Sequence, residues 1–257
     1  MRRTVWLAVA VFSTAGFLSL AAAPVLSPSE AFTREDARKT AQAGSGALAP
    51  VYGPLAGQIV EDYGLAEAEG IGIDLGGGSG TLILELCKRT RLHWVDADIN
   101  PHVFPIFLKA ADEAGFGGRV SAIFADAQAL PFRDNYARIV VSRGSVQFWE
   151  DKPLAFREIY RVLAPGGAAY VGRGFSRNLP AKVARAVREK QKSDGRGGPP
   201  PYDPGETARE FESIMKELKI QEYRIDRPTP PGAGDVNYGV WVGFHKEPLQ
   251  TCRGKGG

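Results

Sequence analysis

The sequence predicts an α/β fold, in which a doubly wound, mostly parallel sheet is covered by helices on both faces. Segments that are apolar on both faces alternate with helix-like segments, a pattern typical of a parallel sheet. The five expected strands are residues 71–76, 92–98, 120–126, 138–144 and 167–174, and the helices between them are 80–89, 101–114 and 153–164. Two further strand candidates, 221–227 and 237–246, are joined by a connection too short for a parallel crossover. We therefore expect this last pair to be antiparallel.

Residues 1–31 are expected to be a signal peptide or a membrane anchor. Arg2 and Arg3 precede an uncharged run of 19 residues from Val5 to Ala23, which would span about 28 Å as a helix. A basic start followed by an apolar run is typical of a secretory signal. If the segment is not cleaved, its charges favour a cytoplasmic N-terminus. We therefore expect a membrane-associated or exported protein, and the sequence leaves the side of the membrane open. The alternative is that this segment forms a buried N-terminal helix of the folded domain.

The rest of the chain is expected to form one domain, residues 49–247, with an insertion or lid at about 175–205. An N-terminal helix and linker, residues 32–48, precede it, and residues 248–257 form a flexible tail. The N-terminal helix is expected over 27–44 with Ser27 or Ser29 as its N-cap, and a second helix over 49–65. An amphipathic helix is predicted over 206–220.

Composition excludes several classes of function. The chain has 32 Lys and Arg against 29 Asp and Glu, a net charge of +3, which argues against a protein built mainly to hold nucleic acid. Its two cysteines, Cys87 and Cys252, and three scattered histidines do not indicate a metal site or a disulfide scaffold, and a single Cys–Cys bridge is left open.

A glycine-rich segment, DLGGGSG at 74–80, follows the first expected strand. Glycines at a strand-to-helix turn permit positive φ and let a ligand approach the backbone, and the next helix presents free N–H groups to an anion. The dinucleotide fingerprint G-x-G-x-x-G is broken, because its third glycine is replaced by Thr81 or Ile83, depending on the starting glycine. A nicotinamide oxidoreductase is therefore disfavoured.

Carboxylates end the next two expected strands. Asp98 closes the second strand, where it can accept both ribose hydroxyls of an adenosine; Asp96 is the competing acid. Asp126 closes the third strand, where it can accept from an adenine amino group while the Ala127 N–H faces a ring nitrogen. The structural alternatives are a helix N-cap by Asp98 or Asn100 before Pro101, and a solvated acid at Asp126. Acids at consecutive strand ends favour a ligand there, since ligands of open α/β sheets bind outside the carboxyl ends.

Four motifs in order resemble the class I S-adenosylmethionine-dependent methyltransferases, especially the small-molecule branch that contains the ubiquinone/menaquinone and sterol C-methyltransferases. They are DLGGGSG at 74–80, VDADINP at 95–101, ADAQALPF at 125–132 and FREIYRVLAPGG at 156–167. The resemblance covers roughly residues 51–173 and implies a Rossmann-like sheet of seven strands, an antiparallel last strand and S-adenosyl-L-methionine as cofactor. The chain departs from the family at Ala137 and Arg138, which replace a usual Phe-Asp before the fourth strand, at its end far from the cofactor.

The resemblance also implies roles for particular residues. Those around the methionine part of the cofactor would be Asp74, Gly76, Gly78 and Gly80. Asp98 would hold the ribose, Ile99 would pack on the adenine, and Asp126 with Ala127 would read the adenine edge.

The acceptor is expected to meet residues at the next strand ends. Arg143 and Arg173 end the fourth and fifth strands, and two guanidinium groups there favour an anionic acceptor. The alternative is that they pair with Glu150, Asp151 or another surface acid. Tyr52 is a further candidate for the pocket wall. No catalytic acid or base is assigned, because methyl transfer from a sulfonium depends mainly on alignment in a dry pocket.

The sequence therefore predicts an S-adenosylmethionine-dependent methyltransferase acting on a small acceptor, either anionic or hydrophobic. The alternative is a non-catalytic S-adenosylmethionine- or nucleoside-binding module tethered to the membrane. Nucleic acid is not an expected partner, and the oligomeric state is not predicted.

Overall fold

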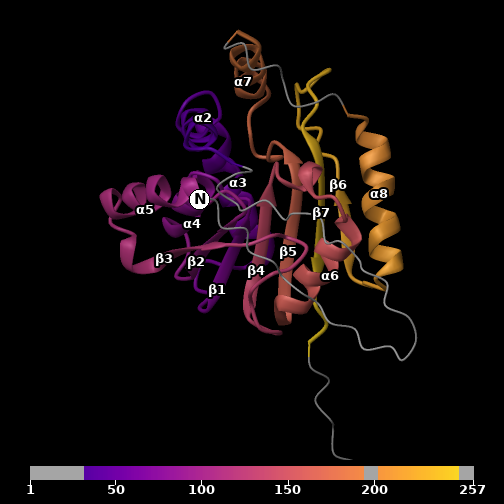
Figure 1. The fold of residues 1–257 in the computed structure, drawn as a ribbon. Coiled ribbons are helices and arrows are strands. Elements are labelled where there is room, and N and C mark those ends of the chain that lie inside the picture. Colours follow the sequence, from indigo (N-terminus) through magenta and orange to yellow (C-terminus); the bar gives the residue numbers. More distant parts are fainter. Residues whose placement is uncertain (1–31, 194–201, 249–257) are drawn as a thin grey trace, which may run out of the picture.

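A computed structural model describes residues 32–193 and 202–248, which form one seven-stranded sheet in the order β3-β2-β1-β4-β5-β7-β6 (Figure 1). The strands are β1 (Ile71–Leu75), β2 (His93–Asp98), β3 (Val120–Phe124), β4 (Ala137–Arg143), β5 (Leu163–Gly174), β6 (Tyr223–Asp226) and β7 (Gly239–His245). β1 to β5 pair in parallel, whereas β7 is antiparallel to both of its neighbours. The expected α/β class, the largely parallel sheet and the antiparallel last strand are confirmed.

Helices cover both faces of the sheet. One face is covered by α3 (Ala49–Tyr63), α4 (Thr81–Cys87) and α5 (Phe104–Glu113), whose aliphatic and aromatic side chains are buried there. The other face is covered by α6 (Lys152–Val162) and α8 (Pro204–Glu217). Figure 1 shows the two remaining helices, α2 (Arg34–Ser45) and α7 (Ala181–Ser193), at the end of the sheet where the parallel strands finish. Ligands of such sheets bind at this end.

Most boundaries differ from the sequence prediction by a few residues, and two of the differences have an identifiable cause. The N-cap of α2 is Thr33 rather than Ser27 or Ser29, because Thr33 and Asp36 form a reciprocal capping box. Strand β5 begins at Leu163 instead of residue 167. The register with β4 shifts in this stretch, where Ala137 pairs with Leu163 but Ile139 pairs with Ala168, so the Ala-Pro-Gly-Gly segment is absorbed as a bulge.

The predicted leader, residues 1–31, lies outside the described residues, as does the last part of the tail. Within residues 32–193 and 202–248, none of the helices combines the length and the apolar character needed to cross a bilayer.

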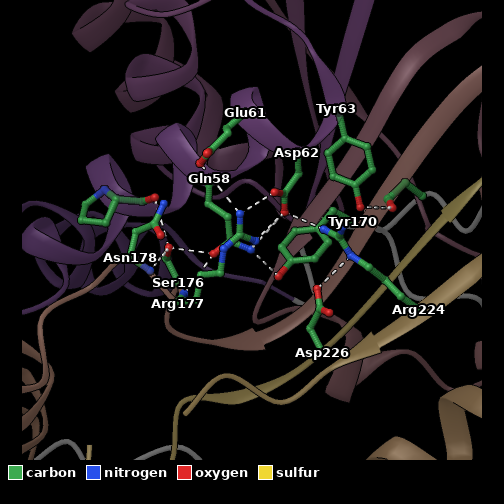
Figure 2. A network of polar contacts seen from close by, with 12 residues as sticks. Gln58, Glu61, Asp62, Tyr63, Tyr170, Ser176, Arg177, Asn178, Arg224 and Asp226 are labelled. Atoms are coloured by element: carbon green, nitrogen blue, oxygen red, sulfur yellow. Dashed lines mark hydrogen bonds and ion pairs between the residues drawn. The ribbon is translucent and has the colours of Figure 1, made fainter. Parts of the chain in front are cut away.

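A network of hydrogen bonds and ion pairs connects α3 to the sheet and to the segment after β5 (Figure 2). Asp62 accepts a 2.7 Å hydrogen bond from Arg177 and pairs with Arg224 of β6. Gln58, almost fully buried, donates to the Tyr170 hydroxyl over 2.9 Å and accepts from Ser176 over 2.8 Å. These contacts set the direction in which the chain leaves β5 towards α7.

Candidate functional site

A cleft of about 750 Å³ lies at the carboxyl ends of β1, β2, β3 and β4. Its size is in the range of pockets that enclose a small organic ligand. Six of the predicted cofactor residues line it: Gly76, Gly78, Asp98, Ile99, Asp126 and Ala127. The structure therefore brings together residues that end or follow three consecutive strands.

The glycine loop, residues 76–80, follows β1 and lines part of this cleft through Gly76 and Gly78. Gly76, Gly78 and Gly80 have φ angles of 69°, 61° and 71°, a region that favours glycine. Gly80 lies behind the cleft: a Cβ there would be 1.9 Å from the ring of Phe107. Its lack of a side chain thus allows α5 to pack on the start of α4.

Asp98 connects this loop to the end of β2. Its Oδ2 accepts a 2.9 Å hydrogen bond from the Gly78 N–H, and its Oδ1 accepts a 2.7 Å bond from the Asn100 N–H. A carboxylate has about four acceptor positions, so further donors such as ribose hydroxyls can be accommodated. The N-cap of the following 3-10 turn is Asn100, whose Oδ1 accepts from the His102 N–H. The N-cap role that was the alternative for Asp98 or Asn100 therefore belongs to Asn100.

Asp126 faces the cleft from the end of β3. Its Oδ1 accepts from the Gln128 N–H over 2.9 Å, and the Gln128 side chain also donates to it. Gln128 Oε1 in turn accepts from the Asp151 N–H at the start of α6. These bonds link the Asp126 carboxylate, through Gln128, to the start of α6.

A pair of buried acids lies directly behind the loop. Asp74 and Asp96 occupy neighbouring register positions on β1 and β2, and a Cβ at Gly77 would be 3.1 Å from an oxygen of Asp74 and 2.5 Å from an oxygen of Asp96. Burial, followed by the charge of Asp98, raises the pKa of Asp74 to about 7, although Arg143 opposes this. Burial and the charges of Asp98 and Asp74 raise the pKa of Asp96 well above its usual value. Asp74 thus lies behind the cleft instead of lining it.

Helix α2 covers part of the cleft, a placement that the sequence did not predict. Phe32, Asp36 and Thr40 line the cavity, and a Cβ at Gly78 would be 2.8 Å from the methyl group of Thr40. Gly44 lets α2 approach the loop, since a Cβ there would be 2.8 Å from Thr81 Oγ1. The capping box predicts where such a helix begins, but its docking is a tertiary contact without a local signal.

The residues proposed for the acceptor lie beside the cleft instead of in its lining. The Arg143 guanidinium is 5.1 Å from the ring centre of Tyr52, and the Arg173 guanidinium is 3.9 Å from the ring centre of Tyr202. Neither Glu150 nor Asp151 pairs with Arg143: Glu150 lines the cleft, and the Asp151 carboxylate accepts from the Leu154 N–H to cap α6.

The cleft wall also includes exposed apolar side chains. Ile99 and Phe148 line the cavity and are 40% and 71% exposed. Such surfaces suit a flat, partly apolar ring. In the part of the chain that the structure describes, no group of three or more His, Cys, Asp or Glu residues is placed to hold a metal ion.

Comparison with known proteins identifies the domain. A family model described as "Methyltransferase domain" matches residues 73–171. The ubiquinone/menaquinone biosynthesis C-methyltransferase UbiE of Photorhabdus laumondii is 34% identical over 116 residues, which are 44% of this chain and 46% of that protein. UbiE of Serratia proteamaculans matches to the same extent. The match spans about half the length of these curated relatives.

Solved structures extend the similarity over most of the fold. A structure described as an S-adenosylmethionine-dependent methyltransferase from Methanococcus maripaludis has a TM-score of 0.69 and 29% identity, covering 85% of this chain and 95% of that one. A methyltransferase from Aquifex aeolicus shares the fold with a TM-score of 0.59 and 14% identity, covering 83% of this chain and 98% of that one.

The lining of the cleft fits S-adenosylmethionine, the cofactor named for the Methanococcus structure. Asp98 and Asp126 contribute carboxylates, Gly76 and Gly78 border the cleft, and Ile99 contributes an apolar surface.

Proposed function

Because residues 73–171 belong to the class I S-adenosylmethionine-dependent methyltransferases, we propose that this protein transfers a methyl group to a small anionic acceptor beside Tyr52, Arg143 and Arg173. The observation that carries the proposal is the hydrogen bond between the Gly78 N–H and Asp98, which joins the glycine loop to a carboxylate in the cleft. The arginines lie at the ends of β4 and β5, next to that cleft.

The residues of this chain act by binding and alignment. When bound, the cofactor supplies a sulfonium methyl group, which an acceptor atom takes with its own electron pair as the methyl–sulfur bond breaks. Asp98 and Asp126 orient the adenosine, and α2 excludes water from one side of the cleft. Holding both reactants in line in a dry site supplies much of the rate.

Turnover tests the proposal. The full-length protein is incubated with S-adenosylmethionine and a mixture of small phenols, amines and organic acids, and S-adenosylhomocysteine is measured by mass spectrometry. We expect product that depends on the added mixture and is lost in Asp98→Ala. Binding of S-adenosylmethionine without turnover by any acceptor would instead indicate the non-catalytic binding module.

We also propose that residues 1–31 direct the protein to a membrane, on the basis of the basic start and uncharged run of that segment. Protease treatment of intact cells, followed by immunoblotting of the full chain, tests this and reports the side. Recovery of the whole protein in the soluble fraction, with the leader still attached, would contradict it.

A further inference from the structure

A second cavity, of about 370 Å³, lies between α7 and the segment that joins β6 to β7. Three cations of α7 line it, Arg185, Arg188 and Lys192, and the facing segment contributes residues 235–237. None of these residues lines the cofactor cleft. The cavity therefore gathers positive charge at a place outside the site described above.

The two arginines of this cavity are held by neutral partners. Arg188 donates to the Gln191 side chain over 3.3 Å and to the Asn237 carbonyl over 3.2 Å. Arg185 donates to the carbonyl of Gly232, in the facing segment. Amide and carbonyl oxygens fix the position of a guanidinium group without removing its charge, so both arginines keep a full positive charge at the cavity.

The carboxylates that line the cavity do not neutralise it. The Asp235 carboxylate is 3.9 Å from Arg185 and its side chain is fully exposed, and an ion pair of this kind contributes little. Glu189 is also exposed. Among residues 32–193 and 202–248, no carboxylate forms an ion pair with Arg188 or Lys192. The cavity therefore keeps a positive charge that suits an anionic ligand.

The predicted leader enters the fold close to α7. Helix α2 begins at Arg34, shortly after residue 31, and its 12 residues span about 18 Å. Leu48, which follows α2, packs against the same buried cluster as Ala184 and Val187 of α7. Figure 1 shows α2 and α7 at the same end of the sheet. A membrane reached by the leader would therefore lie on the side of the molecule that carries α7.

On the basis of the proposed membrane targeting, we propose that the cavity lined by Arg185, Arg188 and Lys192 binds the headgroup of an anionic phospholipid in that membrane. Phosphate oxygens accept charge-assisted hydrogen bonds from guanidinium and ammonium groups. Stable attachment to a membrane commonly combines an apolar anchor with a basic patch. The contact holds the carboxyl end of the sheet, and with it the cofactor cleft, towards the membrane.

Competition between two vesicle populations tests this with the full-length protein. One population is phosphatidylcholine, the other an equal mixture of phosphatidylcholine and phosphatidylglycerol, and flotation gives the ratio of protein on the two. The leader can insert into both, so the ratio reports on the headgroups. We expect the protein to favour the anionic vesicles, and Arg185→Gln with Lys192→Gln to reduce the ratio about fivefold for each charge removed. Arg185→Lys with Lys192→Arg keeps both charges and should keep the ratio.

Arg91→Gln with Lys219→Gln is the matched control. Arg91 and Lys219 are exposed and precede β2 and β6, at the opposite end of the sheet from α7. This variant loses the same two charges and should keep most of the preference for anionic vesicles. Unchanged affinity for S-adenosylhomocysteine shows that each variant is folded.

The outcomes separate this inference from the proposed function. An equal loss of preference in the cavity variant and in the control would contradict the headgroup site, because net charge alone would then explain the attraction. Saturable binding of inorganic phosphate without vesicles, measured by calorimetry, would indicate a soluble anion and overturn the lipid assignment. Failure of the unmodified protein to float with either population would overturn the proposed membrane targeting and this inference with it, while methyl transfer is tested separately by turnover.

Discussion

The backbone N–H of Gly78 donates a 2.9 Å hydrogen bond to Oδ2 of Asp98, 20 residues further along the chain. This bond joins the loop after β1 to the end of β2. The position of the glycine loop and that of the carboxylate expected to hold the ribose therefore depend on each other. A substitution of Gly78 or of Asp98 should shift the position of the other residue.

Gly80→Ala should destabilise the fold. A Cβ at this position would overlap the Phe107 ring, and the φ of 71° is unfavourable for alanine. Strain and overpacking together should cost about 2–5 kcal/mol of unfolding free energy, measured by urea denaturation. Gly57→Ala in α3 is the control, because a Cβ there meets nothing within 4 Å, and it should stabilise by up to about 1 kcal/mol. Equal effects of the two changes would refute the packing argument.

Asp96→Asn should stabilise the protein at pH 8 and change little at pH 5. Folding raises the pKa of Asp74 to about 7 and that of Asp96 well above its usual value. The folded state thus binds protons that the unfolded state has released, and stability falls as pH rises from about 4 through 7. The neutral amide removes one of the two buried acids, a gain of about 1–3 kcal/mol at pH 8.

Urea midpoints at both pH values measure this effect. Asp235→Asn, whose carboxylate is fully exposed, is the control and should show no such pH difference. A loss of stability at pH 8 in Asp96→Asn would mean that the ionised carboxylate is stabilised by partners that this account does not include.

Asp62→Asn should destabilise the protein near neutral pH and lose its effect in acid. Burial alone would raise the pKa of Asp62, but hydrogen bonds and charges from Arg177 and Arg224 lower it below its usual value. A lowered pKa stabilises the folded state above the unfolded pKa, and this stabilisation is lost as pH falls through the folded pKa. Because both arginines are partly exposed, we expect about 1–3 kcal/mol. Thermal unfolding at pH 7 and pH 3 measures it; a pH-independent difference would contradict the ion-pair explanation.

Gly44→Val should weaken S-adenosylmethionine binding without unfolding the domain. The new side chain would meet Thr81 Oγ1 and Ser79 Oγ, and so push α2 away from the glycine loop. A displacement costing about 1–3 kcal/mol corresponds to a roughly 5- to 150-fold weaker affinity, measured by calorimetry. Gln42→Val, at an exposed position of the same helix, is the control. Identical affinities would show that α2 does not cover the bound ligand.

The sheet and the cofactor cleft were predictable because they depend on local patterns. Apolar strands of the right length, glycines after β1, and acids at the ends of β2 and β3 can each be seen in the sequence. The docking of α2 over Gly78 was not predictable. It depends on contacts between segments far apart in the chain, for which the helix carries no local signal.

The most direct test of the central claim is the affinity of the full-length protein for S-adenosylmethionine, compared with that of Asp98→Ala, by titration calorimetry. We predict binding by the unmodified protein and an affinity roughly tenfold or more weaker in the variant, since charged hydrogen bonds to the ribose and to Gly78 are lost together. Equal affinities would contradict the placement of the cofactor at the end of β2.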